Sequence, residues 1–166
     1  LALSAPTGVS ASTNGNNSIF VDWNAVTGAV QYYVYRATTS GGPYTSLATV
    51  SSPTTDYTDN TVSGGVTYYY VITAYGSGSS ACESANSSQV SATALGVCNL
   101  PPSFDGVISA AGVLGAGCTI ELGWNDATDH CGGPVSYTIY RSTASGFSPS
   151  ITTRLAVGLT GTTYQD

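Results

Sequence analysis

Hydrophobic and polar residues alternate with a period of two along most of the chain, and clusters of Gly, Pro, Ser and Asn separate the alternating runs. This pattern is typical of half-buried β-strands joined by turns, and no segment keeps a helical period. The side chains expected to face inward are Ile19, Val21, Trp23, Val30, Tyr32, Val34, Tyr68, Tyr70, Ile72 and Ala74. Those expected to face outward are Phe20, Asp22, Tyr33, Tyr35, Tyr69, Val71, Thr73 and Tyr75. The pattern predicts an all-β protein.

The second half of the chain repeats the first. "TIELGWNDAT" aligns with "SIFVDWNAVT", "VSYTIYRSTASG" with "VQYYVYRATTSG", and "TTYQD" with "TDYTD", so that Trp124 matches Trp23 and Arg141 matches Arg36. Repetition on this scale indicates two domains of one architecture, joined by a stretch that two prolines stiffen. The expected segments are a first domain over residues 1–96, a short Pro-containing linker over 97–102 and a second domain over 103–166.

The first copy resembles the fibronectin type III family at several positions. "APTGVSA" matches its strand A, Trp23 its strand B, Tyr32 its strand C, "SGGVTYYYVITAY" its strand F and "ESANSSQVSATA" its strand G. Tyr68 stands where that family has its tyrosine corner. The resemblance implies two immunoglobulin-like β-sandwiches in tandem, similar to modules on secreted bacterial enzymes and surface proteins. It also implies a spacer, adhesive or assembly role without a catalytic residue.

The second copy matches only strands A, B, C, C′ and E of that family, so the resemblance implies an incomplete sandwich. Without F and G, the side chains of Trp124, Tyr137 and Ile139 lose a cover worth on the order of 10 kcal/mol. Strand C also has an unpaired edge, which invites another strand. Three explanations stay open: the natural chain continues beyond Asp166, a copy or another protein donates strands, or the module is a five-stranded variant.

The chain carries little charge, which excludes several partners. Its 166 residues include three Arg, no Lys and nine acids, with a formal net charge of -6. Such a chain cannot assemble the basic surface that nucleic-acid binding needs. No stretch reaches the roughly 18 to 20 apolar residues of a membrane span, and the chain opens without a basic leader region. We therefore expect a mature, soluble product with no nucleic-acid partner and no membrane insertion.

One loop gathers potential metal ligands. "WNDATDHCGGP" contains Asp126, Asp129, His130 and Cys131, which are all of ligand type. No second His or paired Cys motif completes a ligand set, so we favour a polar turn closed by glycines, with Cys131 in a disulfide. We expect no metal and no other cofactor.

Catalysis has few candidate residues. His130 is the sole imidazole and no GxSxG motif occurs, so a nucleophile would lack a base. The two glutamates, Glu83 and Glu121, lie in different domains, which disfavours a paired-carboxylate site. We expect no catalytic residue and no enzymatic activity.

The outward tyrosines Tyr33, Tyr35, Tyr69 and Tyr75 form a possible interaction face, because strands C and F are neighbours in the resembled fold. Such a face suits stacking on sugar rings or packing on another subunit. The alternative is an ordinary set of solvent-facing strand residues that stabilise the sheet through cross-strand pairing.

The topology of the resembled family places Cys131 near Cys98, so a disulfide between them is expected at the domain junction. Cys82 and Cys118 fall at the far ends of their domains and are too distant to bond within one chain. In a head-to-tail stack, Cys118 of one copy would meet Cys82 of the next, and such a contact builds an open filament. Two free thiols, or another pairing, stay open as alternatives.

Four cysteines, low charge and two glycosylation sequons, at Asn16 and Asn86, fit an oxidising extracellular or cell-surface setting. The leading hypothesis is a non-enzymatic structural or assembly module, a surface protein or filament building block. Its partners would be other protein chains, above all copies of itself that complete the second domain or stack head to tail. The alternatives are a spacer region of a secreted hydrolase and a carbohydrate-binding module that uses the tyrosine face.

Overall fold

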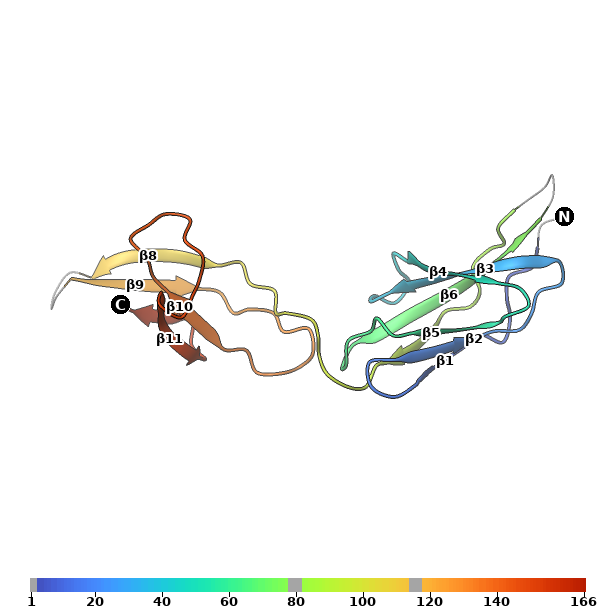
Figure 1. Cartoon of the computed structure of the whole chain (residues 1–166), viewed down its shortest axis with the longest axis horizontal. Helices are drawn as coiled ribbons and strands as arrows, with labels where there is room; N and C mark the ends of the chain where they lie inside the picture. Colours follow the sequence, from blue (N-terminus) through green and yellow to red (C-terminus); the bar gives the residue numbers. More distant parts are fainter. Residues whose placement is uncertain (1–2, 78–81, 114–117) are drawn as a thin grey trace. The chain divides into compact units, whose positions relative to one another are not determined.

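Every regular element of the structure, a computed structural model that describes residues 3–77, 82–113 and 118–166, is a β-strand (Figure 1). The all-β prediction is therefore confirmed. The chain divides into two compact units, Leu1–Asn99 and Leu100–Asp166. The division lies within the segment 97–102 that the sequence marks as a linker.

The first unit is a sandwich of two antiparallel sheets. One sheet has the order β1-β2-β5 and the other the order β4-β3-β6-β7. This arrangement is that of an immunoglobulin-like sandwich. The strands are β1 (Ser10–Thr13), β2 (Ile19–Asp22), β3 (Ala29–Ala37), β4 (Thr45–Ser51), β5 (Asp56–Asp59), β6 (Thr67–Gly76) and β7 (Val90–Thr93).

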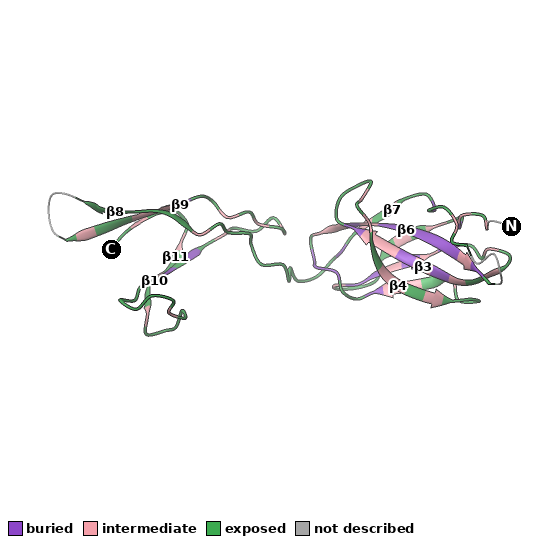
Figure 2. Cartoon of the chain, turned by 90° about the horizontal axis from the view of Figure 1, so that it is seen from above, coloured by how far each residue is buried: buried purple, intermediate pink, exposed green. Residues whose placement is uncertain are grey.

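The core of the first unit lies between the two sheets, where β2, β3 and β6 contribute side chains from alternate positions. Figure 2 colours much of β3 and β6 as buried. The alternating pattern correctly identifies most of the core. The buried members of the core cluster are Ile19, Val21, Trp23, Tyr32, Val34, Val62, Tyr68, Tyr70, Ile72, Ala74 and Ala94.

The expectation that Val30 faces inward is wrong, because this side chain is 42% exposed. The pairing of β3 with β6 shifts its register between Ala29 and Gln31, so Val30 is the extra residue of a β-bulge. The first strand also begins later than "APTGVSA" suggests. Gly8 has a φ of 63°, a left-handed conformation that interrupts an extended segment before Ser10.

Val71 and Thr73 lie on the outward face of β6, as the alternation predicts, but both are buried. Their cross-strand partners on β3 are Tyr35 and Tyr33, whose large rings stand beside them on the outer face. The Thr73 hydroxyl also donates a hydrogen bond to the carboxylate of Glu83, outside β6. The strand is therefore covered on both faces at this point.

The second unit contains the counterparts of five of these strands. One sheet has the order β12-β9-β8, which corresponds to β5-β2-β1, and the other pairs β10 with β11, which corresponds to β3 with β4. The strands are β8 (Val107–Val113), β9 (Thr119–Trp124), β10 (Tyr137–Tyr140), β11 (Arg154–Leu159) and β12 (Thr163–Gln165). Within residues 100–113 and 118–166, β10 has a strand neighbour on one edge and not on the other.

The core of the second unit is small. Its buried cluster consists of Trp124, Tyr137 and Ile139. Most of the second unit is coloured as exposed in Figure 2, including all of β8. The difference between the two units follows from their strands, because a two-stranded sheet covers less of the facing sheet than a four-stranded one.

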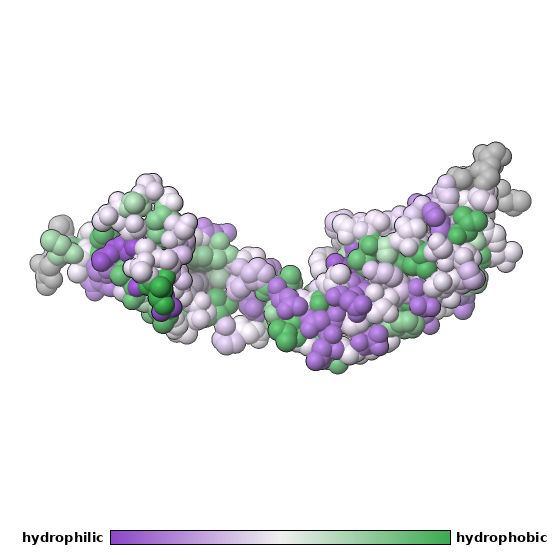
Figure 3. Space-filling view, viewed as in Figure 1, coloured by the Kyte–Doolittle hydropathy of each residue, from purple (hydrophilic) through white to green (hydrophobic). Residues whose placement is uncertain are grey.

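On the face of each unit that Figure 3 shows, most side chains have intermediate hydropathy, and hydrophobic and hydrophilic side chains are interspersed among them. This surface agrees with a chain in which Ser and Thr together supply 46 residues. None of the described residues forms a helix long and apolar enough to cross a membrane.

Candidate functional site

The two units build the same aromatic pair in their cores. The rings of Trp23 and Tyr32 meet edge to face, with centroids 5.4 Å apart and an interplanar angle of 61°. Trp124 and Tyr137 repeat this geometry at 5.3 Å and 61°. The sequence repeat is therefore a structural repeat at the level of individual contacts.

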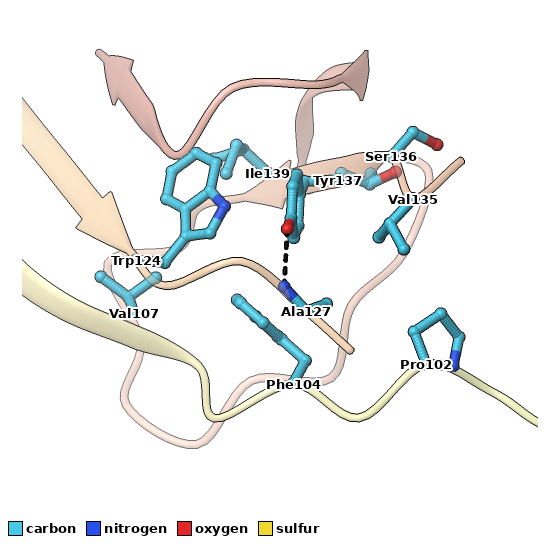
Figure 4. A pocket seen from close by; sticks show the side chains of 10 residues that line it. Pro102, Phe104, Val107, Trp124, Ala127, Val135, Ser136, Tyr137 and Ile139 are labelled. Atoms are coloured by element: carbon cyan, nitrogen blue, oxygen red, sulfur yellow. Dashed lines mark hydrogen bonds between the residues drawn. The ribbon is translucent and has the colours of Figure 1, made fainter. Parts of the chain in front are cut away.

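The tyrosine of each pair anchors the loop after the tryptophan strand. The Tyr32 hydroxyl accepts a hydrogen bond of 2.9 Å from the Val26 amide. The Tyr137 hydroxyl accepts the equivalent bond, 2.8 Å, from the Ala127 amide (Figure 4). Both loops are held although the second is longer.

Each unit also pairs an arginine with an aspartate. Arg36 lies 2.7 Å from the carboxylate of Asp59, at the end of β5. Arg141 makes the same pair with Asp166 at 2.8 Å. The surroundings differ, because the Asp59 side chain is 0% exposed and that of Asp166 is 17% exposed.

The two aspartates occupy equivalent positions in the strand pairing of their units. Asp59 lies opposite Ile19 on β2, and Asp166 exchanges two backbone hydrogen bonds of 2.9 Å with Ile120 on β9. The two isoleucines differ sharply in environment, since Ile19 is 0% exposed and Ile120 is 46% exposed. Ile19 therefore lies in the core of the first unit, whereas its counterpart Ile120 lines an opening in the second.

That opening contains two cavities, which together form what we name the open flank of the second unit. One cavity, of about 240 Å³, is lined by Trp124, Tyr137 and Ile139 and by Phe104 on the other side (Figure 4). The second, of about 250 Å³, is lined by apolar residues together with Arg141 and Asp166. Apolar side chains at an unpaired strand edge are the features of a protein-binding site.

Asp59 shows how the first unit satisfies a buried carboxylate. Burial alone would raise the pKa of Asp59, but hydrogen bonds from Thr61, Arg36 and Tyr70 outweigh it and hold the pKa below its usual value. The Tyr70 hydroxyl donates to the Asp59 Oδ2 at 2.9 Å, and its own pKa is strongly raised, chiefly by burial.

The tyrosine corner is present in the first unit. The Tyr68 hydroxyl accepts a hydrogen bond of 2.9 Å from the Ser63 amide, five residues upstream. The Arg36 guanidinium lies over the Tyr68 ring, 5.0 Å from its centroid. Both contacts fix the turn that leads into β6.

Three of the four tyrosines of the predicted face lie close together. The ring of Tyr33 lies 6.4 Å from that of Tyr35 and 5.9 Å from that of Tyr75, whereas Tyr69 lies further along β6, opposite Ala37. Glu83 joins the face, because the Tyr35 hydroxyl donates to its carboxylate at 2.7 Å and this bond raises the pKa of Tyr35. No sequence signal marks Glu83, which lies far from Tyr35 along the chain. A binding role for this face stays a prediction.

Two of the potential metal ligands in the loop, Asp129 and His130, form hydrogen bonds within the protein. The Asp129 Oδ2 accepts hydrogen bonds from the amides of Cys131, at 3.0 Å, and Gly133, at 2.5 Å. His130 Nε2 lies 2.7 Å from the Ser103 hydroxyl. In the described part of the chain, no three His, Cys, Asp or Glu side chains come close enough to hold a metal ion.

Cys98 and Cys131 are each disulfide-bonded, whereas Cys82 and Cys118 are exposed free thiols. A bond between Cys82 and Cys118 of different copies stays a prediction. The predicted glycosylation sites, Asn16 and Asn86, are both exposed.

Comparisons with known proteins agree with this geometry. No family model matches the chain. A solved fibronectin-type-III-like protein from Clostridium thermocellum is 39% identical, with a TM-score of 0.50 over 61% of this chain and 99% of that one. A poly(3-hydroxybutyrate) depolymerase from Ralstonia pickettii is 39% identical over 90 residues, and an amylopullulanase from Thermoanaerobacter thermohydrosulfuricus is 39% identical over 61 residues. These matches cover 54% and 37% of this chain, but only 16% and 4% of the two enzymes.

Strand order, tyrosine corner and core define an immunoglobulin-like β-sandwich. With the close match to the Clostridium thermocellum protein, they establish that the chain belongs to the fibronectin type III family.

Proposed function

We propose that these residues are a non-catalytic spacer in a larger extracellular hydrolase that acts on a polymer. The observation that carries the proposal is the kind of relative that the chain matches. The two relatives compared above are named as polymer-degrading enzymes, and the chain spans 4% and 16% of their lengths. A segment of that size, with a fold used widely for modules without chemistry, suits the separation of functional domains.

The structure supports a spacer in two further ways. The hydroxyl-rich surface with few charges offers little for specific ionic recognition. In addition, the Asp129 carboxylate of the acidic loop accepts hydrogen bonds from two backbone amides, which is a structural role.

The test is made on the native protein. An antibody raised against residues 1–166 is used to blot the culture medium of the source organism, alongside an activity gel that contains starch or poly(3-hydroxybutyrate). We expect a secreted band far above 16.8 kDa that coincides with hydrolysis, while the 166-residue chain alone hydrolyses neither polymer. A native band near 16.8 kDa, or hydrolysis by the chain alone, contradicts the proposal.

The second candidate is a structural building block of a surface layer or filament. The open flank and the exposed thiols of Cys82 and Cys118 favour it, because both allow contacts between chains. Electron micrographs of the native material and a non-reducing gel test it. Polymers that a reductant shortens support a filament, and monomers on the non-reducing gel contradict it.

A further inference from the structure

Three tyrosine rings lie close together on the outer face of the sheet β4-β3-β6-β7 in the first unit. The ring centroid of Tyr33 lies 6.4 Å from that of Tyr35 and 5.9 Å from that of Tyr75. All three side chains are half-buried, so each keeps part of its surface in contact with solvent. We name these residues the three-tyrosine cluster. Together they offer apolar ring surface next to polar hydroxyl groups.

Neighbouring side chains orient the hydroxyl groups of the cluster. The Gln31 side-chain amide donates a hydrogen bond of 2.6 Å to the Tyr33 oxygen, so the Tyr33 proton remains available to a ligand. The Tyr35 hydroxyl donates to Glu83 Oε1 at 2.7 Å, so its oxygen can still accept a hydrogen bond. Polar groups that the protein already holds in place lose little conformational entropy when a ligand binds.

The Glu83 carboxylate beside the cluster keeps one oxygen for a ligand. Glu83 is exposed, and it accepts hydrogen bonds from the hydroxyls of Tyr35 and Thr73, both at Oε1. Among the residues that the structure describes, none donates to Oε2. A carboxylate has about four acceptor positions, so Oε2 can accept further hydrogen bonds. A ligand that uses this oxygen must supply a hydrogen-bond donor.

The charges of the chain exclude an anionic ligand at this face. The chain has no Lys and three Arg. Arg36 is bonded to Asp59 at 2.7 Å, and Arg141 and Arg154 belong to the second unit. An anionic polymer would therefore meet the negative charge of Glu83 with no Lys or unpaired Arg of the first unit to balance it. The ligand that fits is uncharged.

The chemistry of the face distinguishes the two uncharged polymers that the proposed function offers, and this step rests on that proposal. Poly(3-hydroxybutyrate) has ester oxygens along its chain, which accept hydrogen bonds, but its repeating unit has no donor. Starch is a glucan, whose hydroxyl groups can donate to a carboxylate and whose C–H groups can pack on aromatic rings. The free oxygen of Glu83 therefore favours the glucan over the polyester.

The orientation of the rings favours a coiled chain. The ring of Tyr33 is inclined by 55° to that of Tyr35 and by 68° to that of Tyr75. A flat, ribbon-like polymer such as a β-linked glucan would need rings that lie nearly in one plane. An α-linked glucan coils, so its successive sugar rings also turn relative to one another.

We propose that the three-tyrosine cluster and Glu83 form a binding site for an α-glucan chain. Sugar rings pack on the tyrosines, and a sugar hydroxyl donates a hydrogen bond to Glu83 Oε2. The spacer therefore also holds the polymer on which the hydrolase acts.

The experiment titrates the ¹⁵N-labelled 166-residue chain with maltoheptaose, a short α-glucan. We expect the amides of residues 31–35, 73–75 and 83 to shift, while those of the second unit do not change. Cellopentaose, a short β-linked glucan, should bind at least about ten-fold more weakly. Granules of poly(3-hydroxybutyrate) should not remove the chain from solution when they are sedimented.

Two variants test the named contacts. Glu83→Gln keeps an oxygen for Tyr35 and Thr73 but replaces the other oxygen by an amide group, and it should weaken maltoheptaose binding about ten-fold, as expected for a hydrogen bond to a charged group. Tyr33→Ala removes the ring that lies beside both others and should weaken binding at least about ten-fold. The matched control is Phe20→Ala, which removes a half-buried ring from β2 in the other sheet and should leave binding unchanged.

The outcomes separate this site from the spacer role. An absence of shifts at residues 31–35 and 73–75 in about 10 mM maltoheptaose overturns the proposal, because even a weak site is occupied at that concentration. Unchanged affinity in Glu83→Gln, which alters an exposed side chain, also overturns it, as does equal affinity for cellopentaose. Specific binding of maltoheptaose together with a native band near 16.8 kDa would support the glucan site and contradict the spacer.

Discussion

Asp59 and Asp166 occupy equivalent positions, but their carboxylates meet different numbers of donors. Asp59 accepts hydrogen bonds from Arg36, Thr61 and Tyr70 and is fully buried. Asp166 is bonded to Arg141 and stays partly exposed. The first carboxylate is therefore strongly coupled to the folding of its unit, and the second, which keeps some contact with solvent, is coupled less strongly.

Acid should destabilise the first unit through Asp59. The folded pKa of Asp59 lies below the unfolded value near 3.8, so its stabilisation is complete above that value and is lost as the pH falls through the folded pKa. We expect the urea midpoint of the first unit to drop steadily between about pH 5 and about pH 2. Asp59→Asn should flatten this dependence and cost about 3 kcal/mol at neutral pH, because it leaves Arg36 unpaired.

The control is Asp56→Asn, which changes an exposed acid on the same strand. Its acid dependence should match that of the unsubstituted chain. If the urea midpoint of Asp59→Asn fell with pH as steeply as that of the unsubstituted chain, the acid effect would arise from other groups.

Tyr68→Phe should destabilise the first unit by about 1 to 2 kcal/mol, because the buried Ser63 amide loses the oxygen that accepts its hydrogen bond. Equilibrium urea unfolding measures the change. Tyr69→Phe, next in sequence but on the outer face, should shift the free energy of unfolding by less than about 0.5 kcal/mol. Equal effects of the two substitutions would contradict a structural role for the corner.

At this scale, the alternation of the sequence identifies inward residues where the pairing is regular, as at Tyr32, Val34 and Ile72. It fails at Val30, because a bulge shifts the register and the bulge depends on the neighbouring strand. At Thr73 it gives the correct face but not the burial, because the cross-strand partner Tyr33 and the hydrogen bond to Glu83 are long-range features.

Among the elements, β3 and β10 are the most informative pair. β3 has nine residues and neighbours on both edges, whereas β10 has four residues and is paired with β11. Their sequences, "VQYYVYR" and "VSYTIYR", differ little, so the different lengths follow from the neighbours rather than from strand propensity.

Hydrogen exchange should distinguish these strands. We expect the amides of β3 to be among the most protected in the chain, while those of β10 exchange at least ten-fold faster, because opening β10 breaks bonds on one edge only. Exchange followed by NMR at neutral pH, with the disulfide kept oxidised, gives the comparison. Equal protection of β3 and β10 in a monomer would mean that the second unit closes its own flank.

The sequence repeat predicts which elements the second unit contains but not how exposed they become. Trp124, Tyr137 and Arg141 make the same contacts as their counterparts in the first unit. The exposure of Ile120 has no local signal, because it follows from the small size of the facing sheet, β10-β11.

Across the whole molecule, the two units should unfold separately. The first has a core that spans two sheets, and the second has a core of three buried side chains. The free energy of unfolding rises with the apolar area that folding buries.

Urea denaturation followed by NMR should therefore show two transitions, with signals of residues 100–166 lost first. One shared transition at all signals would contradict independent units.

The scarcity of basic residues has a consequence for proteolysis. Trypsin-like proteases cleave after Lys or Arg, and these 166 residues offer Arg36, Arg141 and Arg154. Arg36 lies within a strand paired on both edges, whereas Arg141 follows the unpaired edge of β10 with its side chain 61% exposed. Cleavage should therefore concentrate in the second unit. Fragment masses alone would then show whether a bound molecule protects the peptide bond after Arg141 from the protease.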